Sequence, residues 1–338
     1  MEGTQPAQLQ DAPGCDVCVH APSLFLTVSI ERPAMAGGGE QGRATDGGHG
    51  SAPDRDEMHF HPGGQGFWVA RLLEHLGVRP VIVSPIGGES GSVLRGLVHT
   101  WGVGLRAVPV ADDSPVYVHD RRDGERREIA RSAMPSLNRH EVDDLYGAVL
   151  ETATRAGVCV VTGKFPGDST PYDFYTRLGA DLDAIGTPAI GDLHRAELDA
   201  LLAGGPLHTL KVSDQDLVKD GLFDEGAGRD ERVEAARRLM ERGARRVVVS
   251  SAEGQTIYVD ERGAYAARPP SLRPADASGS GDSMTAALAF AALRNLDPTE
   301  AIRLACAAGA ANVTRHGLGN ADAGFVQSLA ERVEVERL

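Results

Sequence analysis

The sequence predicts an α/β protein in which helices cover both faces of a mostly parallel central β-sheet, with a small second β-sheet at its side. Two observations predict this three-layer α/β/α arrangement. Short runs rich in Val and Ile alternate with amphipathic helical patterns, and two regions contain strand patterns with no crossover helix within them. A chain of 338 residues, 41% of them hydrophobic, is long enough to bury the core that one such domain needs.

The central sheet is predicted from strands that each follow a helix. This alternation is typical of parallel strands, whose connections run through helices packed on the sheet. The helix–strand pairs are Trp68–Leu76 with Val81–Ser84, His140–Thr154 with Val158–Thr162, Tyr172–Ile185 with Pro188–Asp192, and Glu231–Arg242 with Arg246–Ser250. An earlier strand is expected at Asp16–His20. The C-terminal third is predicted to be helical over Ser283–Arg294, Pro298–His316 and Ala323–Val335.

The small second sheet is predicted from four further strand patterns. These cover Leu24–Glu31, Glu57–His61, Pro115–His119 and Arg126–Arg131. We expect them to pair antiparallel as a lid beside the α/β body, drawn from about residues 24–62 and 113–132. The stretch Pro33–Arg55 is rich in Gly and charge, which favours a mobile loop or insertion. We therefore expect a flexible leader at residues 1–14 and one domain over residues 15–335.

The formal net charge of −14 indicates which kinds of ligand or macromolecule the protein can bind. Binding to nucleic acid or to an anionic membrane surface needs clustered Lys and Arg, so neither partner is expected. A small phosphorylated ligand needs only a local cluster or a helix N-terminus and stays compatible with this charge. No apolar run reaches the roughly 18 residues of a membrane span, and the first residues do not resemble a signal peptide. We expect a cytoplasmic protein.

The cysteines give no sign of a disulfide framework, since there are only four in the chain. Cys15 and Cys18 form a CxxC close to His20, a spacing that also occurs in metal and redox sites. The sequence has no second CxxC, and Cys18 falls within the apolar run of the first predicted strand. We therefore favour small core residues over a metal or redox site.

The most informative segment is Gly279-Ser280-Gly281-Asp282, which leads directly into an apolar helix. Glycines let backbone N–H groups approach a ligand closely, and the N-terminus of a helix carries partial positive charge. Such a turn stabilises the negative charge that develops during phosphoryl transfer. A carboxylate at its last position is placed to take the proton from an attacking hydroxyl. The alternative is an ordinary acidic residue in the first turn of a helix.

The longer segment Asp276-Ala-Ser-Gly-Ser-Gly-Asp282-Ser-Met284 resembles the C-terminal signature of the PfkB/ribokinase-type carbohydrate kinases, and especially that of the 1-phosphofructokinase and tagatose-6-phosphate kinase branch. Other segments are similar to that branch in order and spacing, over roughly residues 15–330. They are Pro62-Gly-Gly-Gln-Gly-Phe-Trp-Val-Ala-Arg71, Pro85-Ile-Gly-Gly-Glu-Ser-Gly91, Gly163-Lys-Phe-Pro166 and Ala308-Gly-Ala-Ala-Asn-Val-Thr314. The resemblance implies a ribokinase-like fold with a β lid, ATP and Mg²⁺ as cofactors, and a small-molecule hydroxyl substrate.

The resemblance also implies roles for the residues of the phosphoryl-transfer half. Asp282 is implied to be the base that deprotonates the acceptor hydroxyl. The backbone amides of Gly279, Ser280 and Gly281 are implied to form the anion hole. The nucleotide pocket is implied to contain Ser251, Gly254, Gly309 and Asn312. Lys211-Val-Ser-Asp-Gln-Asp216 looks like a family segment that organises hydrated Mg²⁺ and phosphates. In it Lys211 is kept, Ser213 replaces Asn, and Asp216 replaces Glu as an indirect Mg²⁺ ligand.

The acceptor half departs from the family. Phe25, Gln65 and Trp68 stand where the branch has Asp, Lys and Asn, and Tyr117 ends a stretch that replaces its polar lid segment. The loss of hydrogen-bonding groups disfavours a sugar phosphate, whereas aromatic rings suit a flat or partly apolar substrate, unless the rings point away and only pack. The remaining acceptor-side candidates are Gly63 and Gly64 at the lid hinge, and Lys164 and Arg131 as holders of a phosphate.

Three functional hypotheses follow. The first is an ATP-dependent phosphotransferase that phosphorylates a hydroxyl of a sugar or sugar phosphate, with Asp282 as base. The second keeps this chemistry for a nucleoside or another ring-bearing alcohol. The third is a non-catalytic nucleotide- or metabolite-binding protein on a kinase scaffold, which the altered acceptor half favours and the intact Asp282 turn disfavours. A homodimer through the lid is also expected, because exposed edges of a small sheet invite pairing between subunits.

Overall fold

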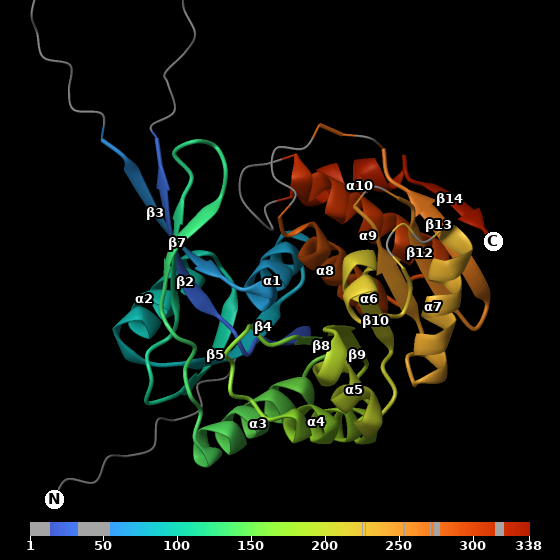
Figure 1. The fold of residues 1–338 in the computed structure, drawn as a ribbon. Helices are drawn as coiled ribbons and strands as arrows, with labels where there is room; N and C mark the ends of the chain where they lie inside the picture. Colours follow the sequence, from blue (N-terminus) through green and yellow to red (C-terminus); the bar gives the residue numbers. More distant parts are fainter. Residues whose placement is uncertain are drawn as a thin grey trace, which may run out of the picture.

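The computed structural model describes residues 14–32, 55–224, 226, 228–252, 254–270, 272–273, 278–314 and 321–338. In this part of the chain the strands form two sheets, one of ten strands and one of four. Figure 1 shows the small sheet standing to one side of a larger α/β body. The predicted fold class is confirmed. Most of the predicted leader and of the stretch Pro33–Arg55 lies outside the described residues.

The large sheet is parallel from β5 to β11 and antiparallel from β11 to β14. In spatial order its strands are β5 (Gly104–Pro109), β4 (Pro80–Ile86), β1 (Val17–His20), β8 (Val158–Thr162), β9 (Ala189–Asp192), β10 (Thr209–Ser213), β11 (Val247–Ser250), β12 (Thr256–Asp260), β13 (Gly263–Arg268) and β14 (Glu334–Arg337). Central strands such as β8 are buried along their whole length. Burial on both faces explains their continuous apolar sequences.

Helices cover both faces of the large sheet and create two apolar cores. Alternation along β1 shows the division, since Val17 and Val19 belong to one core and Cys18 to the other. The first face carries α1 (Gln65–His75), α2 (Gly88–Thr100), α8 (Ser280–Leu293), α9 (Pro298–Val313) and α10 (Ala323–Ala330). The opposite face carries α3 (Arg139–Ala153), α4 (Tyr172–Ala184), α5 (Arg195–Gly204), α6 (Asp214–Lys219) and α7 (Arg229–Glu241). None of the helices in the described ranges is long and apolar enough to cross a membrane.

The small sheet, called the lid below, has the strand order β3, β2, β6, β7. Its strands are β3 (Glu57–Gly63), β2 (Phe25–Glu31), β6 (Val116–Asp120) and β7 (Arg127–Arg131). The expectation of purely antiparallel pairing is wrong for one pair, because β2 and β6 run parallel. In the chain, β2 comes directly after β1 and β6 comes after β5, and β1 and β5 run in the same direction in the large sheet. β3 pairs antiparallel with β2, and β7 pairs antiparallel with β6.

The C-terminal prediction needs a second correction. The helix expected over Ala323–Val335 ends as α10 at Ala330, and Glu334–Arg337 forms β14. This segment pairs antiparallel with β13. The edge of β13 supplies backbone hydrogen-bond partners, and a local helical pattern contains no information about such a distant edge. The strands β5, β12 and β13 were not predicted either.

The core interpretation of the CxxC segment is confirmed for Cys18 but not for Cys15. Cys18 is fully buried in β1, beside Cys159 of β8 in the sheet register. Cys15 is partly buried just before β1, and burial raises the pKa of its thiol to about 12. Among the described residues, no group of three or more His, Cys, Asp or Glu side chains is arranged to hold a metal ion.

Candidate active site

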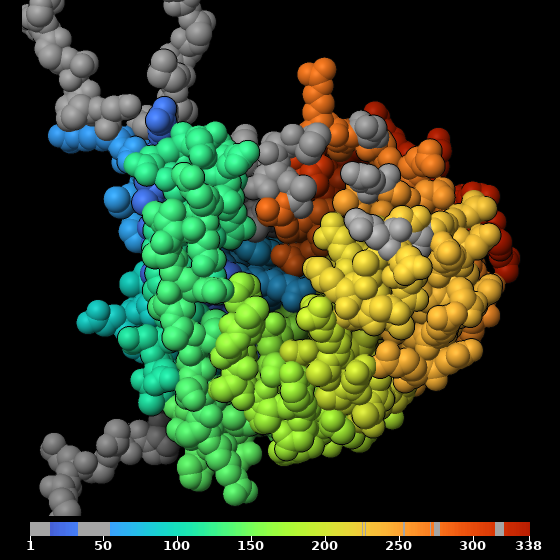
Figure 2. Space-filling model, viewed as in Figure 1, coloured from blue at the N-terminus to red at the C-terminus, as the bar shows by residue number. Residues whose placement is uncertain are grey.

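A cleft of about 830 Å³ lies between the lid and the carboxyl ends of the central parallel strands. Figure 2 shows the hollow between the green lid strands and the yellow and orange body. Its floor includes residues at the ends of β8, β9 and β10 and the start of α8, and β2 and β3 of the lid form the facing wall. In open α/β sheets, ligands bind at this carboxyl edge.

Asp282 lies on the floor of the cleft, in the first turn of α8. The helix begins after Gly279, whose φ of 74° is a left-handed conformation that glycine adopts without strain. Gly279 carries no side chain to cap the helix, so the first N–H groups stay available to a ligand. The turn therefore combines backbone donors, the positive end of a helix and a carboxylate at one point of the cleft.

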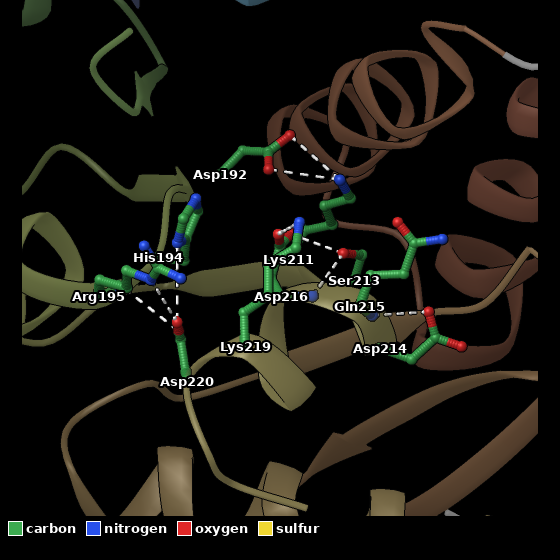
Figure 3. Close-up of polar contacts among 10 residues, drawn as sticks. All are labelled: Asp192, His194, Arg195, Lys211, Ser213, Asp214, Gln215, Asp216, Lys219 and Asp220. Carbon is green, nitrogen blue, oxygen red and sulfur yellow. Dashed lines mark hydrogen bonds and ion pairs between the residues drawn. The ribbon is translucent and has the colours of Figure 1, made fainter. Parts of the chain in front are cut away.

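Two buried charged residues, Lys211 and Asp192, lie next to this turn. The Nζ atom of Lys211 on β10 lies 3.3 and 3.4 Å from the carboxylate oxygens of Asp192 at the end of β9, as Figure 3 shows. Thr285 of α8 donates a hydrogen bond to the same carboxylate. Lys211 also contacts the first turn of α8, because a Cβ added to Gly281 would lie only 2.7 Å from Nζ. Asp192 thus ties Lys211 to the helix that carries Asp282.

The electrostatics of this group suit proton transfer near neutral pH. Burial and the nearby Asp192 carboxylate raise the pKa of Asp282 to about 7, although Lys211 opposes the shift. Burial disfavours the charged form of Lys211, but Asp192 and Asp282 outweigh it and raise its pKa. Lys211 therefore stays a cation while Asp282 exchanges its proton close to neutrality. A base with such a pKa is well matched to general base catalysis.

Asp216 and Ser213 form the part of the site that suits a hydrated cation. Ser213 Oγ donates to a carboxylate oxygen of Asp216 at 2.6 Å and accepts from the Asp216 amide at 3.1 Å, which begins α6 (Figure 3). Burial acts to raise the pKa of Asp216, but the hydrogen bond from Ser213 and the neighbouring His194, Lys211 and Lys219 outweigh it, so the pKa is lowered. One ionised carboxylate in the cleft fits a water-mediated contact to Mg²⁺ better than a cage of protein ligands.

The predicted nucleotide residues fall into two groups. Asn312 Nδ2 donates to the carbonyl of Ser278 at 2.7 Å, and Ser280 Oγ donates to the carbonyl of Gly309 at 3.2 Å. These contacts hold the glycine turn against α9. Ser251 Oγ instead accepts from the amide of Gly254 at 3.0 Å, in the loop after β11. Within the described residues, neither Ser251 nor Gly254 lines the cleft.

Most of the predicted acceptor-side residues line the cleft, but the aromatic ones are largely packed. Cleft-lining residues of this set are Phe25, Gly63, Gly64, Gln65, Trp68 and Lys164. Phe25 and Trp68 are only 6% and 5% exposed. The Phe25 ring lies 4.4 Å from that of Tyr117 and 5.8 Å from that of Phe165, between ring centroids. The rings form an apolar wall more than an open stacking platform.

The structure does not bring Lys164 and Arg131 together as a phosphate-holding pair. Lys164 Nζ donates to the carbonyl of Thr170 at 2.8 Å and lies 4.1 Å from the centroid of the Tyr172 ring. Arg131 lies over the ring of Tyr117 at 5.7 Å and pairs with Glu128 at 3.5 Å. Neither Arg131 nor Tyr117 is among the described residues that line the cleft.

Sequence reasoning missed several charged groups of the cleft, notably Asp192, Arg121 and Arg126. Asp192 did have a signal, because it is a carboxylate at the carboxyl end of a predicted parallel strand. The two arginines lie at the ends of a charged turn between β6 and β7. Nothing local distinguishes a charge that faces a cleft from one that faces water.

Comparison with known proteins decides the family. The profile described as pfkB family carbohydrate kinase matches residues 43–323, which is most of the chain. The chain belongs to the pfkB family of carbohydrate kinases. The ATP-dependent 6-phosphofructokinase isozyme 2 of Escherichia coli is 30% identical over 264 residues, covering 76% of this chain and 83% of the relative. The 1-phosphofructokinase of Bacillus subtilis is 25% identical, covering 82% and 89%.

Solved structures of pfkB-family relatives agree with this membership. Phosphofructokinase-2 from Escherichia coli in complex with potassium has a TM-score of 0.79 and 25% identity, covering 94% of this chain and 99% of that chain. The same enzyme in complex with fructose-6-phosphate has a TM-score of 0.77, with the same identity and coverage. The predicted family, fold and activity class, an ATP-dependent carbohydrate kinase, are confirmed.

Proposed function

We propose that this pfkB-family kinase transfers the γ-phosphoryl group of ATP to a hydroxyl of a sugar, a sugar phosphate or a related alcohol, with Asp282 as the general base. The observation that carries the proposal is the position of Asp282, on the cleft floor at the N-terminus of α8, with a pKa of about 7. The Escherichia coli and Bacillus subtilis relatives are named as phosphofructokinases, which supports an acceptor of this class.

The proposed reaction needs one proton transfer and one phosphoryl transfer. The Asp282 carboxylate accepts the proton of the acceptor hydroxyl while its oxygen bonds to the γ-phosphorus, and the bond between that phosphorus and the leaving oxygen of ADP breaks. The amides of Gly279, Ser280 and Gly281 stabilise the charge on the transferring group. Lys211 stays protonated beside them and adds positive charge.

The nucleotide and the metal are assigned to the other predicted residues. Gly309 and Asn312 shape the turn that receives the phosphates, and Ser251 and Gly254 shape the loop proposed to border the nucleotide. Mg²⁺, when bound with ATP, neutralises phosphate charge during transfer. Asp216, with Ser213 orienting its carboxylate, is the residue that would hold the hydration shell of that ion.

The ring-bearing acceptor remains a second candidate substrate. Its support is the apolar wall around Phe25 and Trp68, which offers no replacement for the hydrogen-bonding side chains found in the phosphofructokinase branch. In either case the lid is proposed to close over the acceptor and exclude water, which would otherwise accept the phosphoryl group.

Replacement of Asp282 tests the function. We expect Asp282→Asn to bind ATP with unchanged affinity and to lose phosphorylation of an acceptor panel by roughly 10²–10⁴-fold, the usual contribution of a general base. The panel contains hexoses, hexose phosphates and ring-bearing alcohols, and product formation is followed by mass spectrometry. Asp199→Asn, at an exposed carboxylate that pairs with Arg242, is the control and should keep full turnover. Wild-type turnover in Asp282→Asn would refute the assignment.

We also propose a homodimer formed through the lid. Met58 and Phe60 of β3 are 62% and 52% exposed, and strand alternation places both on the face opposite to His59 and His61. Exposed apolar side chains that share one face of a sheet favour association. A relative supports assembly, since one solved structure is the tetrameric inhibited form of Escherichia coli phosphofructokinase-2.

A further inference from the structure

We propose that His194 binds the β- or γ-phosphate of the nucleotide, and that Arg195 and Asp220 hold the His194 ring in the place that this contact requires. His194 is then a phosphate-binding residue on the floor of the cleft, and Arg195 and Asp220 are positioning residues. This inference rests on the proposed function, because it adds a residue to the nucleotide side of the same site.

The turn between β9 and α5 has an uncommon backbone conformation. Arg195 has a φ of 54°, in the left-handed region, and is one of two non-glycine residues with positive φ in the part of the chain that the structure describes. The other is Asn295, and Asn adopts this conformation more readily than Arg. A left-handed Arg costs free energy and persists only where its surroundings fix it, as they do at many active sites. This turn follows Asp192 on the floor of the cleft.

Asp220, at the end of α6, fixes this turn. Its carboxylate accepts a hydrogen bond from the backbone N–H of Arg195 at 3.3 Å and another from Arg195 Nε at 3.1 Å (Figure 3). The backbone N–H of Asp220 donates in turn to the carbonyl of Asp216 at 2.9 Å, and only 12% of the Asp220 side chain is exposed. Two contacts from one well-held carboxylate explain how the left-handed conformation persists.

The fixed turn directs the His194 ring into the cleft. His194 is the N-cap of α5, yet its side chain makes no capping hydrogen bond to the helix. Its Nδ1 atom is buried and lies 3.8 Å from Asp220 Oδ1, beyond hydrogen-bond range (Figure 3). The side chain is nevertheless 42% exposed, and His194 lines the cleft. The exposed part of the ring therefore faces the space that a ligand would fill.

The position of the ring beside Asp216 indicates a phosphate as that ligand. Burial acts to raise the pKa of Asp216, whereas the Ser213 hydrogen bond and then His194 lower it, so the ring lies near this carboxylate. Asp216 is the residue proposed to hold the hydration shell of Mg²⁺, which accompanies the terminal phosphates of ATP. Hydrogen bonds to phosphate oxygens are among the strongest in proteins.

The other basic side chains on the body side of the cleft already hold protein groups. Among the described residues that line this side, the basic ones are Lys164, His194 and Lys211. Lys164 Nζ donates to the carbonyl of Thr170 at 2.8 Å. Lys211 Nζ pairs with both carboxylate oxygens of Asp192. His194 is therefore the basic side chain of this set that a nucleotide can engage without breaking a hydrogen bond within the protein.

Calorimetric binding of ATP and of AMP, each with Mg²⁺, tests the inference. We expect His194→Ala to weaken ATP about tenfold, the usual loss for a hydrogen bond to a charged group, and AMP by less than about twofold, because AMP lacks both terminal phosphates. His194→Gln keeps a donor and should recover part of the affinity for ATP. The matched control His99→Ala, at an exposed histidine in the last turn of α2, should bind both nucleotides as wild type does.

A double variant tests the positioning roles. Asp220→Asn and Arg195→Gly should each weaken ATP about threefold and leave AMP unchanged, because both act by fixing the ring. Since the ring is absent from His194→Ala, adding Asp220→Asn to that variant should cause no further loss of ATP affinity. A full additional loss in the double variant would overturn the positioning role of Asp220, because the residue would then act on ATP binding without His194.

The outcomes for His194 and for the proposed base are distinguishable. Wild-type affinity of His194→Ala for ATP, or equal losses for ATP and AMP, would overturn the inference and leave the kinase assignment intact, since that assignment depends on the loss of turnover in Asp282→Asn. Full turnover in Asp282→Asn together with a selective loss of ATP affinity in His194→Ala would instead refute the base and support the phosphate contact.

Discussion

At the scale of single residues, Asp282 owes its chemistry to its neighbours. Burial and Asp192 raise the pKa of Asp282 to about 7. The fraction of Asp282 in the proton-accepting carboxylate form therefore increases as the pH rises through neutrality. We therefore expect the turnover number at saturating substrates to increase about tenfold per pH unit below pH 7 and to level off above it. A rate–pH profile from pH 5.5 to 9 measures this. A turnover number that stays constant down to pH 5.5 would contradict the role of Asp282.

Asp192 is the positioning residue behind this behaviour. It holds Lys211 with both carboxylate oxygens, and its charge adds to burial in raising the Asp282 pKa. In Asp192→Asn the repulsion disappears while Lys211 still attracts the Asp282 carboxylate. We expect the midpoint of the rate–pH profile to move to lower pH by about one unit, worth about 1.4 kcal/mol, and turnover to fall because Lys211 loses its anchor.

Thr285→Val is the matched control for Asp192→Asn. It removes a hydrogen bond to the Asp192 carboxylate but keeps the charge. The midpoint should therefore stay close to that of the wild-type enzyme even if turnover decreases. An Asp192→Asn profile with an unchanged midpoint would show that Asp192 acts only on structure.

At the scale of elements, the first turn of α8 depends on the absence of a side chain at Gly281. A Cβ there would lie 2.7 Å from Lys211 Nζ, which Asp192 keeps from moving freely. We expect Gly281→Ala to lower turnover about tenfold while the free energy of unfolding changes by less than about 1 kcal/mol, because alanine otherwise favours a helix. Chemical denaturation and steady-state kinetics measure the two effects.

The control for this variant is another helical glycine. Gly96 in α2 is exposed and has no atom within 4 Å of an added Cβ. Gly96→Ala should stabilise the protein by about 0.5–1 kcal/mol and leave turnover unchanged. If Gly281→Ala behaved in the same way as Gly96→Ala, the contact between Lys211 and the helix would have no catalytic role.

The elements also show what a sequence can and cannot predict. Strand β8 was predicted with its observed bounds, because a strand buried on both faces has a continuous apolar sequence. Strand β14 was missed, because its identity depends on the edge of β13, a distant part of the chain. The same distinction applies to the site. The Gly279–Asp282 turn is a local pattern, whereas the contact between Asp192 and Lys211 depends on the pairing of β9 with β10.

At the scale of the whole molecule, the position of the lid decides how the cleft closes. The lid meets the body near Gly64, whose φ is 108° and where an added Cβ would lie 2.3 Å from the carbonyl oxygen of Ser23. The chain therefore passes close to the body at this point. Met58 and Phe60 share one face of β3, where they border the cleft and stay 62% and 52% exposed. Pairing of two such faces would cover these side chains and fix both lids at once.

This arrangement predicts how the assembly responds to a change on the lid. We expect the wild-type protein to sediment at twice the chain mass at micromolar concentration, and Phe60→Glu to sediment as a monomer, because a buried unpaired carboxylate is costly. Ile185→Glu, at an apolar residue 42% exposed at the end of α4, should remain a dimer. A monomeric wild-type protein, or a dimer that Phe60→Glu does not weaken, would exclude the lid as the interface.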